Sequence, residues 1–363
     1  MPTFILGAGF NADAAGEAGP LFAESLYDGH YQVDCGYPLV GDTIRLCFGL
    51  EVIPDGKSVE QLFSDALARG DYDPIKKLAE RVNYADFRIA NALASGEREN
   101  VYQQFFRTFA DSNFVTFNYD SLPETFLIRL RRWYPHDGYG VRVAVAPMLP
   151  SEEAPPDTTS STLVLHLHGS LCIRTDDTRI DRTPGHAMAM LSLRDEPLYI
   201  FDPHSISGNF APWGRYPGSV DLKDRIIAPI LDKSQGLKQK FICDTYSRAE
   251  AMVRDSDIVV AVGYSFNLHD RASYQRLLHA QGESTGRRLL VVSPDAAIVA
   301  NAIRPDFPNL SIQAQVATFK QWVDASFPGL GNHAETRGRT GRKPPPRDLT
   351  RSRAAPLVQH GAP

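Results

Sequence analysis

The sequence lacks the features that mark zinc ribbons, membrane proteins and secreted proteins. Its four cysteines, Cys35, Cys47, Cys172 and Cys243, are widely spaced and form no CxxC pair. Structural zinc sites usually take their ligands from such pairs, so we expect neither a zinc ribbon nor another metal site. No apolar run approaches the roughly 20 residues needed to cross a bilayer, and the N-terminal segment has neither the basic start nor the long apolar stretch of a signal peptide. The sequence therefore predicts a cytoplasmic protein with reduced thiols and no membrane partner.

Basic residues are scarce outside the C-terminal end. The whole chain has a formal net charge of −5. The last thirty residues carry seven basic and two acidic side chains, so they contribute +5 and leave −10 for residues 1–333. Binding of nucleic acid needs clustered lysine and arginine, which excludes the acidic body and leaves only the tail for that purpose. Residues 331–363 are rich in Gly, Arg and Pro, a composition that predicts a disordered basic tail.

Short apolar runs alternate with amphipathic stretches along the rest of the chain. This alternation predicts an α/β fold, a Rossmann-like parallel sheet with helices on both faces. Each run is short and mostly apolar, as expected for strands that are covered on both sides. The candidate strands are Thr3–Leu6, Asn113–Phe117, Thr162–His168, Ile258–Val262, Arg288–Val292 and Leu310–Ala314.

The interval between the first two strands is far longer than a simple βαβ crossover. It contains three stretches with helical periodicity, at Val59–Ala68, Pro74–Ala94 and Val101–Ala110. We therefore expect an inserted helical module at about residues 40–111. An irregular lobe is expected at about residues 170–232, which are rich in Gly, Pro and Asp. Both would belong to a single catalytic domain spanning residues 1–330.

The first motif follows the first strand and reads FILGAGFNADA. Gly7-Ala8-Gly9 allows a tight turn and close approach of backbone amides to a pyrophosphate, with a helix expected to begin near Asn11. The spacing of Gly7, Gly9 and Ala12 also fits the permissive dinucleotide fingerprint. A glycine turn with a purely structural role explains the motif equally well.

The second motif, FVTFNYDSLPE, carries a strand into the polar residues Asn118, Tyr119 and Asp120 before a helix. Ligands of open α/β sheets lie outside the carboxyl ends of the strands, where these side chains would project. Asp120 or Ser121 could simply cap the helix that begins at Leu122. Capping does not explain the amide of Asn118.

The third motif, TLVLHLHGSL, is an alternating strand in which His166 and His168 share one face and Gly169 follows directly. Two histidines at this spacing could bind a metal, but no third ligand is close in sequence. A histidine at a strand end is more often structural than catalytic. Next to a glycine at the mouth of a crevice, His168 could serve as a general base near neutral pH.

Two further strands also end in small and polar residues. DIVVAVGYSFNLHD ends in Gly263 and Ser265, which offer close backbone approach and a hydroxyl. RRLLVVSPDAA places Asp295 where it could accept hydrogen bonds from ribose hydroxyls, although Ser-Pro-Asp is also a good helix start. Together, five strand ends carry the layout of a nucleotide crevice.

These five segments, in this order over residues 3–325, resemble the sirtuin family and more specifically its bacterial sirtuin-like branch. The resemblance implies that Gly7, Ala8 and Gly9 form the NAD phosphate loop. Asn11 then stands where sirtuins usually have serine, with Asp13 nearby.

The same resemblance implies roles for the later motifs. Asn118 and Asp120 match the Asn and Asp of the T-x-N-x-D motif, and His168 matches the catalytic histidine. Gly263 and Ser265 match the G-x-S loop beside the cofactor, and Asp295 falls in the segment that holds the adenosine ribose. The expected catalytic residues are therefore Asn118, His168 and Asp120.

The sequence also departs from protein-deacylating sirtuins. Those enzymes carry two cysteine pairs after the catalytic histidine, and residues 169–250 supply none. The helical module is similar to that of sirtuin-like effectors of bacterial antiphage defence, which hydrolyse NAD. The resemblance thus implies an NAD glycohydrolase that cleaves the nicotinamide–ribose bond and releases nicotinamide and ADP-ribose, with NAD as substrate.

Two other functions would use the same pocket. A protein deacylase or ADP-ribosyltransferase would need an acceptor groove, and an NAD or ADP-ribose sensor would bind nucleotide without cleaving it. An enzyme that depletes NAD must be kept silent until needed, so we expect control by homo-oligomerisation or by a partner. The resemblance suggests a ring-forming ATPase or another defence-system protein as that partner.

Overall fold

The structure of the protein is a computed structural model. Six parallel strands form its central sheet. The structure describes residues 1–18, 40–145, 159–176, 198–201, 226–234, 236–283 and 285–331. The sheet has the order β4-β2-β1-β7-β8-β9, and every pairing is parallel. Its strands are β1 (Thr3–Leu6), β2 (Asn113–Thr116), β4 (Val164–His166), β7 (Ile258–Val262), β8 (Arg288–Ser293) and β9 (Ser311–Val316). The predicted Rossmann-like parallel sheet is confirmed.

The strand order indicates where a ligand would bind. From β1 the chain moves outward through β2 to β4 and then returns to β7, on the other side of β1. Leu6, the last residue of β1, pairs with Thr116 of β2 and with Val262 of β7, so the three carboxyl ends lie at one edge. The order reverses between β1 and β7, and in such sheets the crevice beside this reversal is where ligands bind.

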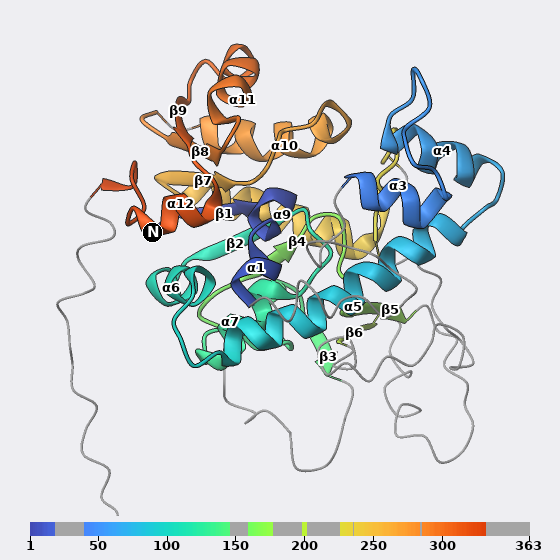
Figure 1. Ribbon diagram of the computed structural model, residues 1–363. Helices are drawn as coiled ribbons and strands as arrows, with labels where there is room; N and C mark the ends of the chain where they lie inside the picture. The colour runs from blue at the N-terminus through green and yellow to red at the C-terminus, as the bar shows by residue number, and fades with distance from the viewer. Residues whose placement is uncertain are drawn as a thin grey trace, which may run out of the picture.

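Helices cover both sides of this sheet (Figure 1). Helices α10 and α11 lie on one side, and α6 and α7 lie on the other. Outside the insert the helices are α1 (Ala14–Ala18), α7 (Leu122–Arg129), α9 (Lys240–Asp255), α10 (Arg271–Gly282), α11 (Ala296–Ile303) and α12 (Phe319–Asp324). Buried apolar strands therefore have apolar cover on both faces, which explains why they read as continuous hydrophobic runs.

Aromatic rings build the core beneath β1 and β2. The ring of Phe4 on β1 stacks on Phe114 of β2, with centroids 5.4 Å apart, and meets Phe105 edge-on at 5.0 Å. All three side chains are fully buried. Because offset and edge-to-face aromatic pairs add to the energy of burial, this cluster fixes the strands whose ends carry the site.

Helices occupy the described part of the interval between β1 and β2 where the sequence predicts a helical module. Within residues 40–111 the described helices are α3 (Val40–Phe48), α4 (Val59–Ala68), α5 (Asp73–Ser95) and α6 (Val101–Thr108), and α1 precedes them. Local sequence explains two of their starts, because Ser58 accepts a hydrogen bond from the Gln61 amide and Asn100 forms a capping box with Gln103. Phe63 of this module belongs to the same hydrophobic cluster as Leu171, the last residue of the third motif, and Ile226. The insert therefore contacts the segments around the site.

A second, smaller sheet has the order β3-β6-β5. It consists of β3 (Val143–Val145), β5 (Ile173–Asp176) and β6 (Leu198–Phe201), with β6 parallel to β3 and antiparallel to β5. Part of the lobe predicted to be irregular is thus regular. Residues 177–197 and 202–225 of that lobe, and 332–363 of the basic tail, lie outside the described residues.

The described residues include helices and acidic, histidine and cysteine side chains that bear on membrane and metal binding. None of the helices there combines the length and the apolar composition required to span a bilayer. In the same part of the chain, no three His, Cys, Asp or Glu side chains gather in a way that could hold a metal ion.

Candidate active site at the carboxyl ends of the strands

The loops after β1 and β7 interlock through glycines. The Gly9 amide donates a hydrogen bond to the Gly263 carbonyl at 2.9 Å, and the Gly7 amide donates to Val262 at 3.0 Å. A Cβ atom on Gly7 would lie 2.6 Å from the Gly263 oxygen. A Cβ on Gly263, whose φ is +61°, would lie 2.2 Å from the Phe10 nitrogen. Close packing of two backbones therefore requires these glycines, which bears out the structural interpretation of the motif.

The residues after Gly7 do not form the helix that the sequence predicts near Asn11. Residues Ala8–Asn11 form a single 3-10 turn, and α1 begins only at Ala14. Ala8 and Gly9 are exposed at the edge of the sheet, whereas Asn11 is buried. The exposed pair remains the part of the predicted phosphate loop that a ligand can reach.

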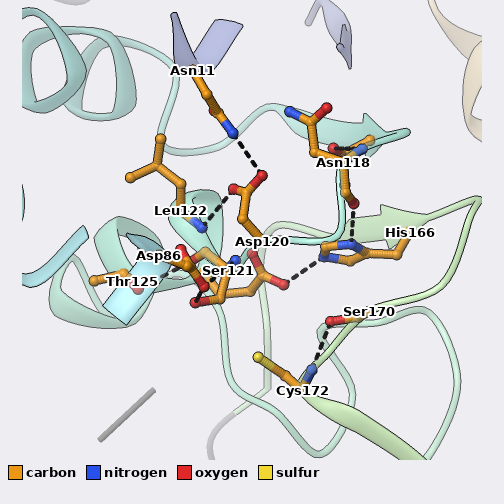
Figure 2. Close-up of polar contacts among 12 residues, drawn as sticks. Asn11, Asp86, Asn118, Asp120, Ser121, Leu122, Thr125, His166, Ser170 and Cys172 are labelled. Atoms are coloured by element: carbon orange, nitrogen blue, oxygen red, sulfur yellow. Dashed lines mark hydrogen bonds and ion pairs between the residues drawn. The ribbon is translucent and has the colours of Figure 1, made fainter. Parts of the chain in front are cut away.

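Asp120 links the loop after β1 to the loop after β2 (Figure 2). Its Oδ2 accepts a hydrogen bond from Asn11 Nδ2 at 2.6 Å, and its Oδ1 accepts one from the Leu122 amide at 3.1 Å. Asp120 thus caps α7, as the alternative interpretation of the sequence held, while Ser121 makes no side-chain cap. The Ser121 hydroxyl and amide donate instead to Asp86 of α5.

Two carboxylates therefore share this buried region. Burial raises the pKa of Asp120 to about 6, against the opposing hydrogen bonds from Leu122 and Asn11. Burial and the nearby Asp120 raise the pKa of Asp86. Sequence reasoning missed Asp86. It occupies a buried position of α5, and the helical periodicity does not show that this position holds a polar residue with a polar partner.

Asn118 lies directly over the end of β1. Its Nδ2 donates to the Gly7 carbonyl at 3.1 Å, and its backbone amide donates to Thr116 Oγ1 at 3.0 Å. The carbonyl of Asn118 accepts a hydrogen bond from His166 Nδ1 at 3.0 Å. The amide predicted to be catalytic is thus held against the glycine turn predicted to bind phosphate.

His166 holds the loop that carries Asn118 in place. Its Nε2 lies 2.6 Å from Glu124 Oε1 of α7, and both side chains are fully buried. Burial alone would lower the pKa of His166, but the Glu124 carboxylate outweighs it and the pKa is raised. His166 is a structural histidine, and the two ring nitrogens are both used in holding the Asn118 loop.

His168 lies just beyond the end of β4 in a different environment. It is 3% exposed, and its ring meets the edge of Phe117 with centroids 4.9 Å apart. Phe117 in turn stacks on Tyr264 at 4.3 Å. Burial and the positive charge of Lys233 hold the pKa of His168 well below its usual range. The imidazole is therefore neutral, the form that a general base needs.

Asp270 and Lys233 complete the surroundings of His168. Asp270 Oδ1 lies 3.6 Å from His168 Nε2 and contacts Lys233 Nζ. Sequence reasoning missed both residues. Asp270 is the last residue of the DIVVAVGYSFNLHD motif, in which only Gly263 and Ser265 were given roles, whereas Lys233 has no motif around it.

The remaining predicted residues lie farther along the sheet edge. Asp13 Oδ2 accepts a hydrogen bond from the Lys320 amide at the start of α12, at 3.1 Å, so a capping role explains its position. Ser265 and Asp295 follow β7 and β8 and are exposed. Asp295 precedes α11 without a side-chain cap. Their roles toward a nucleotide remain predictions.

No family model matches the chain, and no curated protein matches it. Solved structures of Sir2 homologues are similar to it. One, a complex of a Sir2 homologue with NAD, is 16% identical, with 89% of this chain and 86% of that chain covered at a TM-score of 0.41. Another, a Sir2 homologue variant with ADP-ribose, is 15% identical, with 92% and 91% covered at a TM-score of 0.39.

Proposed function

We propose that this chain is an NAD glycohydrolase that cleaves the nicotinamide–ribose bond. The proposal rests on the resemblance of the five strand-end motifs to the sirtuin-like family. The observation that supports it best is the hydrogen bond from Asn118 Nδ2 to the Gly7 carbonyl. This contact joins the expected catalytic amide to the expected phosphate loop at the reversal of strand order, where a dinucleotide would lie.

In this proposal NAD lies across the edge of the sheet. The adenosine half points toward Ser265 and Asp295, and the nicotinamide ribose points toward Asn118 and His168. Asn118 orients the ribose hydroxyls or the attacking water, and Asp120 acts through its contacts with Asn11 and Leu122, which fix the loop that carries Asn118. Holding reactants in this way converts binding energy into rate.

The reaction breaks one bond and forms another. Water attacks the anomeric carbon of the nicotinamide ribose while the carbon–nitrogen bond to nicotinamide breaks, and its electron pair leaves with the nicotinamide ring. The neutral imidazole of His168 accepts the proton that the water loses. The products are nicotinamide, ADP-ribose and one proton. Phe117, which contacts the imidazole, and Tyr264, which stacks on Phe117, are both buried and would limit access of bulk water to the base.

The biological setting of the proposal comes from the same resemblance. Sirtuin-like effectors of antiphage defence support a cytoplasmic role in which NAD is depleted during infection. In cells such an activity must be restrained until a trigger appears, so we expect the purified protein to have a basal rate that activation raises. We expect that activation to come from a homo-oligomer or from a defence-system partner such as a ring-forming ATPase.

The test follows nicotinamide and ADP-ribose by chromatography after the purified protein is incubated with NAD. We expect the wild type to release both products in equal amounts, and His168→Ala and Asn118→Ala to release neither while remaining folded. His279→Ala, an exposed histidine on α10, is the matched control and keeps wild-type activity.

Other outcomes would replace the proposal. Consumption of NAD by His168→Ala at the wild-type rate contradicts it. Label transferred from NAD to protein without free ADP-ribose indicates a transferase, nicotinamide release that depends on an acylated peptide indicates a deacylase, and intact NAD retained by the protein indicates a sensor.

A further inference from the structure

Asp270 turns its carboxylate away from the helix that it precedes. It is the residue directly before α10, where a carboxylate usually accepts hydrogen bonds from the first helical amides. Its side chain makes no such bond. Oδ1 instead contacts Lys233 Nζ and lies 3.6 Å from His168 Nε2. A residue placed to cap a helix thus faces the imidazole and a lysine.

Lys233 and His168 approach the same oxygen atom. Lys233 is 8% exposed, so its ammonium is largely removed from water. Nε2 of His168 is buried, has no hydrogen-bond partner within the described residues, and stands beyond the roughly 2.7–3.2 Å of an N–H···O bond to Asp270. An unpaired buried nitrogen is costly. Side-chain packing alone does not explain why this nitrogen lies beside a carboxylate that already contacts a lysine.

We propose that Asp270 is the positioning residue of His168, and that Lys233 shares the same carboxylate oxygen to keep the imidazole neutral. This inference rests on the proposed function, in which His168 is the base. A carboxylate 3.6 Å from Nε2 favours the tautomer with the proton on Nε2 and the ring orientation that faces it, and so leaves Nδ1 for the substrate. The positive charge of Lys233 disfavours the imidazolium, so the imidazole is neutral when it meets the attacking water.

The other charges near this pair do not compete with that assignment. Burial raises the pKa of each tyrosine around Asp270, so these phenols stay neutral below pH 10; they are Tyr119, Tyr246, Tyr264 and Tyr274. Arg271, next in sequence, pairs with Asp306 at 2.9 Å on the exposed side of α10. Within the described residues, Lys233 is the charge that lowers the pKa of His168, and the Asp270 carboxylate lies 3.6 Å from its Nε2.

The first test reads the imidazole directly and needs no activity. Protein labelled with ¹⁵N-histidine is titrated by NMR, with the His168 signals assigned from their absence in His168→Gln. We expect Lys233→Met to raise the pKa of His168 by about one unit or more, since Asp270 then acts unopposed. The double variant with Asp270→Asn should lose this rise. A His168 titration unchanged by Lys233→Met, or a rise that persists in the double variant, overturns the proposal.

The second test measures NAD cleavage against pH in the same proteins. We expect Asp270→Asn to lower kcat by about 10- to 100-fold with KM unchanged, and Asp270→Glu to restore part of it. Lys233→Met should move the acid limb of kcat/KM to higher pH, because a base of higher pKa is protonated at higher pH. Asp306→Asn, which removes a carboxylate from the exposed pair at the same end of α10, should change neither.

The two tests separate failure of the inference from failure of the proposed function. Wild-type protein that cleaves no NAD contradicts the proposed function, while the NMR titration still decides whether Asp270 and Lys233 govern His168. Active protein in which Asp270→Asn raises KM but leaves kcat unchanged contradicts the positioning role alone. Thermal unfolding of each variant, close to that of the wild type, shows that the substitutions act locally.

Discussion

The two halves of the sheet edge are built differently. Beyond β1, β2 and β4, buried polar side chains contact one another, as Asn11 does with Asp120 and His166 with Glu124. Beyond β7 and β8 the residues expected to bind the nucleotide, Ser265 and Asp295, are exposed. One half is therefore preorganised, and the other offers open positions that a ligand can occupy.

This difference agrees with separate roles for the two halves, one in chemistry and the other in binding. A reacting centre needs groups held in place before substrate arrives, because misplacement of a catalytic group is costly in rate. A binding surface for a nucleotide needs space and exposed donors or acceptors. In the proposed function, chemistry belongs to the half around Asn118 and His168, and recognition of adenosine belongs to the half around Ser265 and Asp295.

The largest loss of stability is expected on substitution in the buried pair of Glu124 and His166. Its absence would contradict the comparison of the two halves. Removal of one partner leaves the other charge buried and unpaired, so Glu124→Leu should lower the free energy of unfolding by about 3–5 kcal/mol. The pKa of His166 is raised in the folded protein, so the pair stabilises fully below the pKa of an unfolded histidine, about 6.5. That stabilisation is lost as pH rises through the folded-state pKa. Urea unfolding at pH 6 and pH 9 should therefore show the greater loss at pH 6.

Glu283→Leu is the control for that measurement, because its exposed contact with Arg254 at 2.7 Å lies far from the site edge. Its cost should stay under about 1 kcal/mol. Equal costs for the two substitutions would mean that the preorganised half is not stabilised by its buried pair.

The seam between the halves should be the next most sensitive place. Gly263→Ala adds a Cβ within 2.2 Å of the Phe10 nitrogen, so the loops after β1 and β7 must separate. We expect a loss of about 3 kcal/mol or more in urea unfolding. Gly286→Ala is matched, since Gly286 also has positive φ, +77°, but nothing lies within 4 Å. It should cost only about 1–2 kcal/mol, and an equal loss at both glycines would contradict the close packing of the seam.

The smallest effects are expected in the open half. Ser265→Ala and Asp295→Ala each remove one hydrogen-bonding group, worth about 0.5–1.5 kcal/mol, from the binding of adenosine. Steady-state kinetics with NAD should show KM raised about 2- to 10-fold with kcat unchanged. Loss of kcat in either variant, or unchanged KM in both, would remove the distinction between the halves.

The sequence predicted the strands well because each is a local run of apolar residues. The bounds of β1 and β7 agree with the expected ones, and β9 is displaced by only a residue or two. Asp120 could be read locally as a cap because its partner amide, Leu122, is two residues away. The glycine motif was compatible with both of its interpretations, since close backbone approach serves a neighbouring loop as well as a phosphate.

Other parts of the site could not be predicted because their partners are distant in sequence. The role of His166 depends on Glu124, 42 residues away, and that of Asp270 on Lys233, 37 residues away. In the sequence, His166 is only a strand residue on the same face as His168, and Asp270 is only the last residue of the segment that follows the fourth strand motif. Only the packing of α7 and α10 against the sheet edge shows which charge each one meets.

The most direct test of the account is a crystal structure of His168→Ala with ADP-ribose. We predict that the diphosphate lies beside Ala8 and Gly9, with the adenosine at Ser265 and Asp295 and the distal ribose at Asn118. Ordered nucleotide elsewhere on the protein, or bound with adenosine at Asn118, would contradict the assignment of chemistry and recognition to the two halves.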